Sequence, residues 1–318
     1  MKKSLLVTLA DKNFIDQVKQ MLASVYFNAG WKGDYMLLAH NIPEKELKWF
    51  LKKGIIVKRC RPLDIEKTRK GDVLTSYSKF YLFTEDMKKW KNIVYLDADV
   101  IVRANLDDLS KVEGFAAVLD PVSKLCYHFD PGMWEICYLR DPAFNSGVMA
   151  FSTNLIQKDT FLKIKKLFDR CGKWSFFHDQ GILNLYFHKR WKKLPIIYNV
   201  FPNLIRYCIN MEKIDGIILH FAGKNTEDVR LIKSKNFFPH REWRHNLERA
   251  DLIDLSIIPE GKKWNSSRKI TYNLYLEFGK FLYSSFRVLI SIFNSVIRHF
   301  QRTYLHLAFI INRHFNVG

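Results

Sequence analysis

Apolar and polar positions follow two alternating patterns along most of the chain. Continuous apolar runs are typical of buried strands, and apolar residues three or four apart are typical of helices. The predicted strands are 5–9, 35–39, 55–57, 93–99, 114–118, 147–151 and 216–221. The predicted helices are 15–27, 44–53, 79–90 and 155–171. Strand and helix alternate, which predicts an α/β protein with a mostly parallel sheet and helices on both faces.

The pattern changes after residue 260, where basic residues become frequent and strands disappear. We therefore predict one domain over 1–260 and a basic amphipathic helical tail over 261–318. On a helix that advances ~100° per residue, five cations fall within about 60–80° of arc. They are Lys280, Arg287, Arg298, Arg302 and Arg313. Apolar side chains fill the far side, as in helices that lie in the plane of an anionic membrane. The alternative is a helix that packs on its own domain.

Charge and cysteine usage narrow the classes of partner. The 318 residues have a net charge of +19, which favours a phosphorylated substrate, an anionic membrane or nucleic acid. We expect no nucleic acid, because few aromatic residues interleave with the charges and no reader motif is present. Five scattered cysteines form no zinc pattern and favour a reducing compartment, with a Cys126–Cys137 bridge as the open alternative.

The amino-terminal residues resemble the start of a signal peptide but lack a cleavage site. The apolar part of 1–10 ends at Asp11, so we interpret it as the first buried strand. No stretch reaches 18 uninterrupted apolar residues, and no transmembrane helix is predicted. These features favour a cytoplasmic protein.

Two carboxylates close the apolar run 93–99, with Ala98 between them. Residues two apart on a strand share a face, so Asp97 and Asp99 are expected to converge at the strand's carboxyl end, where open α/β sheets bind ligands. Paired oxygen ligands suit a hard divalent cation with open positions for phosphate oxygens. The alternative for this motif alone is a strand followed by a polar turn.

Three further motifs accompany the carboxylate pair. Phe-Asn-Ser-Gly at 144–147 places compact polar side chains before a predicted strand. Asp-Gln-Gly-x-Leu-Asn at 179–184 places a carboxylate and an amide at a predicted helix start. His-Phe-x-Gly-Lys at 220–224 places an imidazole at a strand end, followed by a glycine and a cation.

These motifs, in this order and at these separations, resemble glycosyltransferase family 8. The family includes glycogenin and bacterial lipopolysaccharide galactosyl- and glucosyltransferases, and the resemblance runs over 5–223. It implies a GT-A fold, with a single Rossmann-like sheet, and a UDP-sugar donor. It also implies Mn²⁺, with Mg²⁺ as the alternative, and transfer with retention of the anomeric configuration. Asp97, Asp99 and His220 match the metal ligands, and this set of two oxygens and one nitrogen fits Mn²⁺ better than Mg²⁺.

The resemblance also implies the residues around the donor. Thr8 and Leu9 match the edge of the uracil pocket, and Lys79 matches a basic residue near the sugar and phosphate. The remaining nucleotide-sugar positions are Asp97, Ala98, Asp99, Asp120, Asn145, Ser146, Asp179, Gln180, Gly223 and Lys224. Asn145, Asp179 and Gln180 match the reaction centre. The family's Lys-Pro-Trp after the histidine motif is absent, because Thr226 stands at its lysine position. Lys224, on its flexible stem, could reach the same phosphate.

We therefore expect an enzyme that moves galactose or glucose from a UDP-sugar to a lipid-linked saccharide. It would work on the inner face of the cell membrane, held there by the tail. The amide of Gln180 is a poor nucleophile, so we expect acceptor attack from the face that the diphosphate leaves. Two alternatives stay open: a glycogenin-like transferase to a protein or soluble glycan, and a protein that binds nucleotide sugars without turnover.

Overall fold

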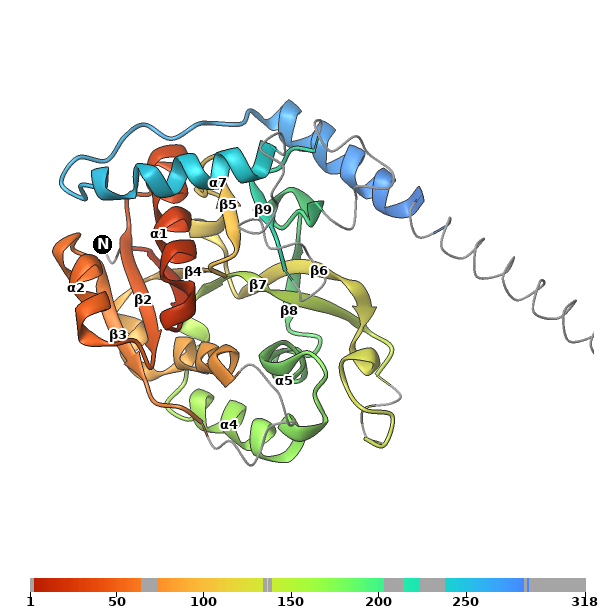
Figure 1. The fold of residues 1–318 in the computed structure, drawn as a ribbon. Helices are drawn as coiled ribbons and strands as arrows, with labels where there is room; N and C mark the ends of the chain where they lie inside the picture. Colours follow the sequence, from red (N-terminus) through yellow and green to blue (C-terminus); the bar gives the residue numbers. More distant parts are fainter. Residues whose placement is uncertain are drawn as a thin grey trace, which may run out of the picture.

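A computed structural model describes residues 3–63, 74–133, 136, 139–202, 214–222, 238–282 and 285. Its centre is a seven-stranded sheet in the order β3-β2-β1-β4-β7-β6-β8 (Figure 1). The strands are β1 (Leu5–Ala10), β2 (Asp34–His40), β3 (Ile56–Cys60), β4 (Asn92–Leu96), β6 (Phe115–Lys124), β7 (Pro142–Ser152) and β8 (Trp191–Leu194). Four of the six pairings are parallel, and β7 runs antiparallel to both neighbours. The predicted α/β class and mostly parallel sheet are confirmed.

Helices cover both faces of the sheet because its strands are apolar on both sides. On β1, Leu6 faces one hydrophobic cluster and Leu5 and Val7 face the other. The first cluster includes side chains of α1 (Ile15–Ser24), α2 (Glu44–Lys52) and α7 (Phe238–Glu248). The second includes side chains of α4 (Thr160–Cys171) and α5 (His178–Tyr186). Figure 1 shows α1 and α7 side by side, and the two helices are in contact.

Two predicted elements differ in form. The helix expected at 79–90 is two 3-10 helices, Leu74–Phe83 and Glu85–Lys89. The strand expected at 147–151 begins earlier, so the polar residues of the Phe-Asn-Ser-Gly motif lie within β7 and not before it. They are nevertheless buried, because β7 lies between β4 and β6 and is covered on both faces.

A second, two-stranded sheet joins β5 (Val100–Val102) to β9 (Ile218–His220). The pair is antiparallel, with Val100 opposite His220 and Val102 opposite Ile218. This register brings the predicted imidazole ligand to the turn that carries the two carboxylates.

The described part of the predicted tail lies against the domain. Residues 266–282 form a helix, drawn in blue in Figure 1. Trp264 and Leu276 are buried in the first hydrophobic cluster, and Asn273 accepts a hydrogen bond of 2.8 Å from the backbone of Ile196. The domain division at 260/261 stays a prediction, and most of the basic stripe lies outside the described residues. Within the described ranges, no helix is long and apolar enough to cross a membrane.

Candidate active site

The two carboxylates lie in the turn between β4 and β5. They converge at the carboxyl end of β4 as predicted, but not as two residues on one face of a strand, because β4 ends at Leu96 and the backbone turns before β5. The turn is fixed at both ends: the Asp97 N–H donates to Gly147 O over 2.8 Å, and the Phe221 N–H donates to Asp99 O over 3.0 Å. Convergence thus comes from a turn that bridges the two sheets.

His220 completes a group of three that can hold a metal ion. One ligand atom from each of Asp97, Asp99 and His220 lies within 4.8 Å of the others. The His220 Nε2 atom is 3.3 Å from Asp99 Oδ1 and 3.9 Å from Asp97 Oδ2. Within the described residues this buried nitrogen has no hydrogen-bond partner. An unpaired buried nitrogen beside two carboxylates fits a divalent cation as the missing partner.

Two neighbours fix the orientation of the imidazole. His220 Nδ1 is 2.8 Å from Asn199 Oδ1, and an amide oxygen only accepts, so Nδ1 carries a proton. In the neutral imidazole, Nε2 then keeps its lone pair for a metal ion. Gly147 lies against the ring, where a Cβ atom would stand 2.1 Å from His220 Cε1. The glycine of the Phe-Asn-Ser-Gly motif therefore makes room for the histidine.

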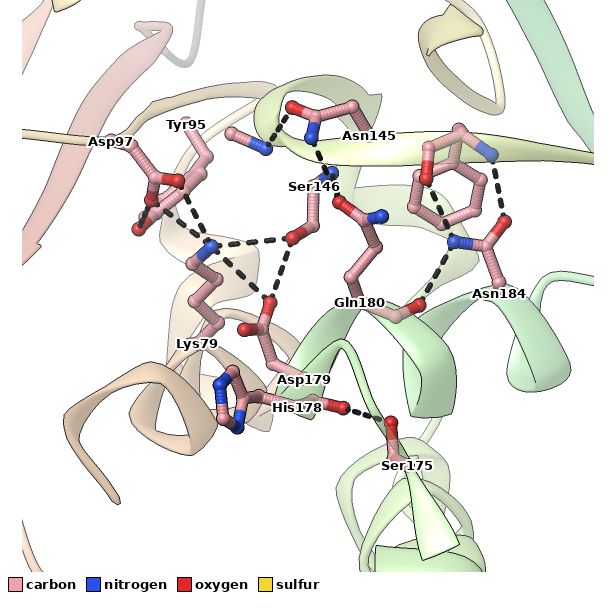
Figure 2. A network of polar contacts seen from close by, with 12 residues as sticks. Lys79, Tyr95, Asp97, Asn145, Ser146, Ser175, His178, Asp179, Gln180 and Asn184 are labelled. Carbon is pink, nitrogen blue, oxygen red and sulfur yellow. Dashed lines mark hydrogen bonds and ion pairs between the residues drawn. The ribbon is translucent and has the colours of Figure 1, made fainter. Parts of the chain in front are cut away.

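One buried cation, Lys79, lies close to two carboxylates (Figure 2). Lys79 Nζ lies 3.0 Å from Asp97 Oδ1 and 3.2 Å from Asp179 Oδ2. Lys79 also donates to Ser146 Oγ over 3.3 Å, and Ser146 Oγ donates to Asp179 Oδ2 over 2.8 Å. The carboxylates of Asp97, Asp99 and Asp179 outnumber this single ammonium, so the site has room for further positive charge.

Burial and these ion pairs set the protonation of the cluster. Burial alone would lower the pKa of Lys79, but Asp179 and Asp97 outweigh it and raise that pKa, so the ammonium stays charged. Burial raises the pKa of Asp179, although Lys79 opposes the shift. Burial would also raise the pKa of Asp99, but a protonated His220 and Lys79 outweigh it and lower that pKa where no metal ion takes the place of the His220 proton. A charged Asp99 is the form that binds a cation.

A chain of amides connects the metal-ligand group to the start of α5. Asn199 Nδ2 donates to Asn145 Oδ1 over 2.9 Å, and Asn145 Nδ2 donates to Gln180 Oε1 over 2.8 Å. Gln180 Nε2 donates to Asp120 Oδ2 over 2.9 Å. Asn184 fixes this end of α5, because its amide donates to Gln180 O and Phe144 O, each over 2.8 Å (Figure 2). Buried networks in which each group has a partner are rigid.

Of the other predicted residues, Thr8, Leu9 and Ala98 are buried. Thr8 and Leu9 lie on β1, and the Thr8 hydroxyl has no partner among the described residues. Ala98 is buried at the centre of the turn between β4 and β5. Gly223 and Lys224 lie outside the described residues, so the substitute for the missing family lysine stays a prediction.

The sequence patterns did not point to three residues of this site. Asn199 holds His220, and the Tyr95 hydroxyl donates to Asp97 Oδ1 over 2.6 Å. Gln20, on α1, donates to Val100 O over 2.8 Å and so supports the carboxylate turn. Asn199 follows the apolar run 196–198, and a polar residue at such a place is a signal for a buried hydrogen bond. Gln20 interrupts the apolar spacing of its helix in the same way.

The sequence profile described as Glycosyl transferase family 8 matches residues 5–226, so the chain belongs to this family of retaining hexosyltransferases that use nucleotide sugars. Galactinol synthase 1 of Arabidopsis thaliana is 25% identical over 253 residues, 70% of this chain and 66% of that protein. Human glycogenin-1 is 30% identical over 147 residues, 43% of this chain and 36% of that protein. The chain thus spans slightly under two thirds of the galactinol synthase and about a third of glycogenin-1.

Solved glycosyltransferases share the fold. Galactosyltransferase LgtC, in complex with donor and acceptor sugar analogs, superposes with a TM-score of 0.57 at 15% identity over 80% of this chain and 98% of that chain. The glycosyltransferase GlyE of Streptococcus pneumoniae gives 0.55 at 20% identity over 83% of this chain and 67% of that chain. The predicted GT-A fold is confirmed.

Proposed function

We propose that the protein transfers a hexose, galactose or glucose, from a UDP-sugar to a lipid-linked saccharide with retention of configuration. The observation that carries the proposal is the convergence of Asp97, Asp99 and the unpaired Nε2 of His220 beside the Lys79–Asp179 pair. Metal ligands and a sugar-binding network meet at one place, as a diphosphate-linked sugar requires. LgtC, which shares the fold, is a galactosyltransferase.

A divalent ion, which we propose to be Mn²⁺, would be held by Asp97, Asp99 and His220. Bound there, it would neutralise the negative charge of the departing diphosphate. Lys79 adds a positive charge on the same side, 3.0 Å from Asp97. These charges stabilise the leaving group as the glycosidic bond breaks.

The sugar carbon develops oxocarbenium character as that bond breaks. Asp120, Asn145 and Gln180 form one hydrogen-bonded group that would hold the sugar hydroxyls. The Asp179 carboxylate is paired with Lys79 and Ser146, so it favours positive charge on the sugar rather than bond formation. We therefore propose front-face transfer. The acceptor oxygen bonds to the anomeric carbon as the bond from that carbon to the phosphate oxygen breaks, and the departing phosphate oxygen takes the proton of the acceptor hydroxyl.

A lipid-linked acceptor is supported by the described surface of the C-terminal helix. Its outer face exposes an apolar stripe, of which Phe278 is 60% exposed and Phe281 is 64% exposed. The stripe consists of Ile270, Leu274, Phe278, Phe281 and Leu282. It leads into the basic residues predicted to contact an anionic membrane, so we propose peripheral attachment to the inner face of the membrane. Because 261–282 packs on the domain, a separable tail would begin after this helix.

The decisive experiment is UDP release by the full-length protein across a panel of UDP-sugars, with Mn²⁺ and with EDTA. We expect slow, EDTA-sensitive hydrolysis of one donor, which identifies the sugar. UDP binding without turnover of any donor would instead support a protein that binds nucleotide sugars.

Vesicle binding tests the membrane part separately. A chain ending at residue 285 should hydrolyse the donor like the full chain but lose binding to anionic phosphatidylglycerol vesicles. Equal vesicle binding by both chains would exclude residues 286–318 as the anchor. Donor hydrolysis combined with transfer only to a soluble glycan would favour the glycogenin-like alternative.

A further inference from the structure

A cavity of about 1080 Å³ lies at the other end of the β5–β9 sheet from the metal-ligand group. Its lining includes Arg103, which follows β5, and Asp215, which precedes β9. The Arg103 N–H donates to Ile217 O over 2.8 Å, which continues the pairing that begins at Val100 and His220. Three residues of strand separate Val100 from Arg103, or about 10 Å at ~3.3 Å per residue. The cavity is therefore separate from the active site.

The start of the C-terminal helix gives the cavity an aromatic wall. The rings of Trp264 and Tyr272 are 5.2 Å apart, and those of Tyr272 and Tyr275 are 6.3 Å apart. Trp264 is buried and anchored in the core, whereas Tyr275 is 40% exposed. Such rings offer flat apolar surface together with hydroxyl groups. A pyranose ring, with C–H groups on its faces and hydroxyls at its edge, matches this surface.

A chain of ion pairs lines the cavity next to these aromatic rings. Arg103 donates through Nε and Nη2 to Glu242 Oε2 over 3.0 and 2.6 Å, and its Nη1 lies 3.3 Å from Asp215 Oδ1. Arg268 Nη2 donates to Asp215 Oδ2 over 2.6 Å, and its guanidinium lies 4.2 Å from the centroid of Trp264. The two arginines and two carboxylates neutralise one another, and they present fixed donors and acceptors for hydroxyl groups.

Two lysines add positive charge that this chain of ion pairs does not balance. Lys262 and Lys263 both line the cavity and are exposed, and Lys263 Nζ lies 3.4 Å from Oε1 of the exposed Glu260, which is outside the lining. The backbone of Lys262 is fixed, because its N–H donates to Asn28 O over 2.7 Å and its carbonyl accepts from Asn105 N over 2.9 Å. Four cations and two carboxylates line the cavity, so its lining has a net charge of +2. An anionic ligand matches that charge.

We propose that this cavity binds a saccharide that carries a carboxylate or phosphate group. A sugar ring packs on Tyr272 and Tyr275, its hydroxyls bond to the braced arginines and carboxylates, and its negative group pairs with Lys262 and Lys263. The volume, at about the upper end of the ~300–1,000 Å³ typical of ligand sites, fits more than one sugar unit. The cavity's use as an anchor for the distal part of the acceptor rests on the proposed function; the binding itself does not.

The test is ligand-observed NMR titration of the full-length protein with 3′-sialyllactose and with glucose 6-phosphate. Lactose and glucose are the matched neutral probes. We expect the charged probe to bind about tenfold more tightly than its neutral partner, and a Lys262→Ala/Lys263→Ala variant to lose that difference. Tyr275→Ala should weaken binding of charged and neutral probes alike, because it removes the stacking surface. Lys32→Ala, which removes an exposed lysine outside the cavity, is the control for loss of positive charge elsewhere on the surface.

Three results would overturn the proposal. The first is equal binding of the charged and neutral probes. The second is a loss of binding in the Lys32→Ala control as large as in the Lys262→Ala/Lys263→Ala variant. The third is a loss of binding in Asp99→Ala, which would place the saccharide in the active site. Donor hydrolysis is measured separately on the same variants. If the protein hydrolyses no donor but still binds the charged probes through Lys262 and Lys263, the proposed function is rejected and the cavity site is kept. If it hydrolyses a donor but does not bind the charged probes in this way, only the cavity site is rejected.

Discussion

The metal-ligand cluster and the cavity beside the C-terminal helix both contain carboxylates and cationic side chains, but carboxylates are in excess in the cluster and cations are in excess in the cavity. In the cluster, the buried Lys79 faces the carboxylates of Asp97 and Asp179, and Asp99 lies beside His220. In the cavity, arginines and lysines outnumber carboxylates. An excess of carboxylates favours a bound cation, and an excess of cationic side chains favours a bound anion. The sign that is in excess in each region therefore sets the charge of its ligand.

Burial makes the two regions differ in energy as well. Removing one partner of a buried ion pair leaves an uncompensated charge and costs about 3–5 kcal/mol, whereas an exposed pair contributes about 0–1 kcal/mol. Lys79 is buried, but Arg268 is half-exposed, with 48% of its side chain accessible. Substitutions in the cluster should therefore alter catalysis and stability, and substitutions in the cavity should alter binding alone.

Asp99→Ala should give the largest effect. Loss of one ligand oxygen should lower metal-dependent donor turnover by about 10²–10³-fold, because the leaving diphosphate loses its counter-charge. UDP release in the presence of Mn²⁺ measures it, with circular dichroism to check the fold. Asp16→Ala, an exposed carboxylate, is the control. Full activity in Asp99→Ala would show that the cluster is not the cation site.

Lys79→Met should destabilise the protein by about 3–5 kcal/mol, because Asp97 and Asp179 lose their shared cation. Urea unfolding in EDTA measures the loss. Adding Asp179→Asn should restore part of the stability, since one uncompensated charge is then removed. An unchanged unfolding midpoint in Lys79→Met would show that the carboxylates do not depend on this ammonium.

Asn199→Ala should weaken metal binding by about 10–100-fold, the usual effect of losing a group that orients a ligand histidine. The imidazole proton is then free to move to Nε2, which removes the ligand lone pair. Calorimetric titration with Mn²⁺ measures the affinity without any turnover. Asn199→Asp keeps an acceptor for Nδ1–H but loses the donor to Asn145 Oδ1, so it should retain more of the binding than Asn199→Ala. Equal weakening in both variants would point to packing rather than to the tautomer.

Tyr275→Ala should give the smallest effect, with stability changed by less than about 0.5 kcal/mol, because this ring is largely at the surface. Donor hydrolysis should match the unsubstituted protein. Phe278→Ala, on the same helix but outside the cavity, is the size-matched control. A loss of donor hydrolysis confined to Tyr275→Ala would show that the cavity and the cluster are not independent.

The sequence by itself determined the local elements and the family. Apolar runs defined β1, β2 and β4, and the spacing of apolar residues defined α1, α2 and most of α4. Four motifs, in a fixed order along the chain, were enough to indicate glycosyltransferase family 8. These features are local: backbone preference and periodic burial operate within a few residues, so they can be read along the chain.

Only the tertiary structure decided how the motifs meet. The antiparallel β7 and the register of β5 with β9 place His220 beside residues more than a hundred positions earlier. Asn199 then selects which imidazole nitrogen faces the carboxylates, and the braced cavity forms only because Arg103, Asp215 and Arg268 come together. Contacts between such distant segments depend on strand register and on the pairing of buried charges. Neither leaves a periodic trace in the sequence.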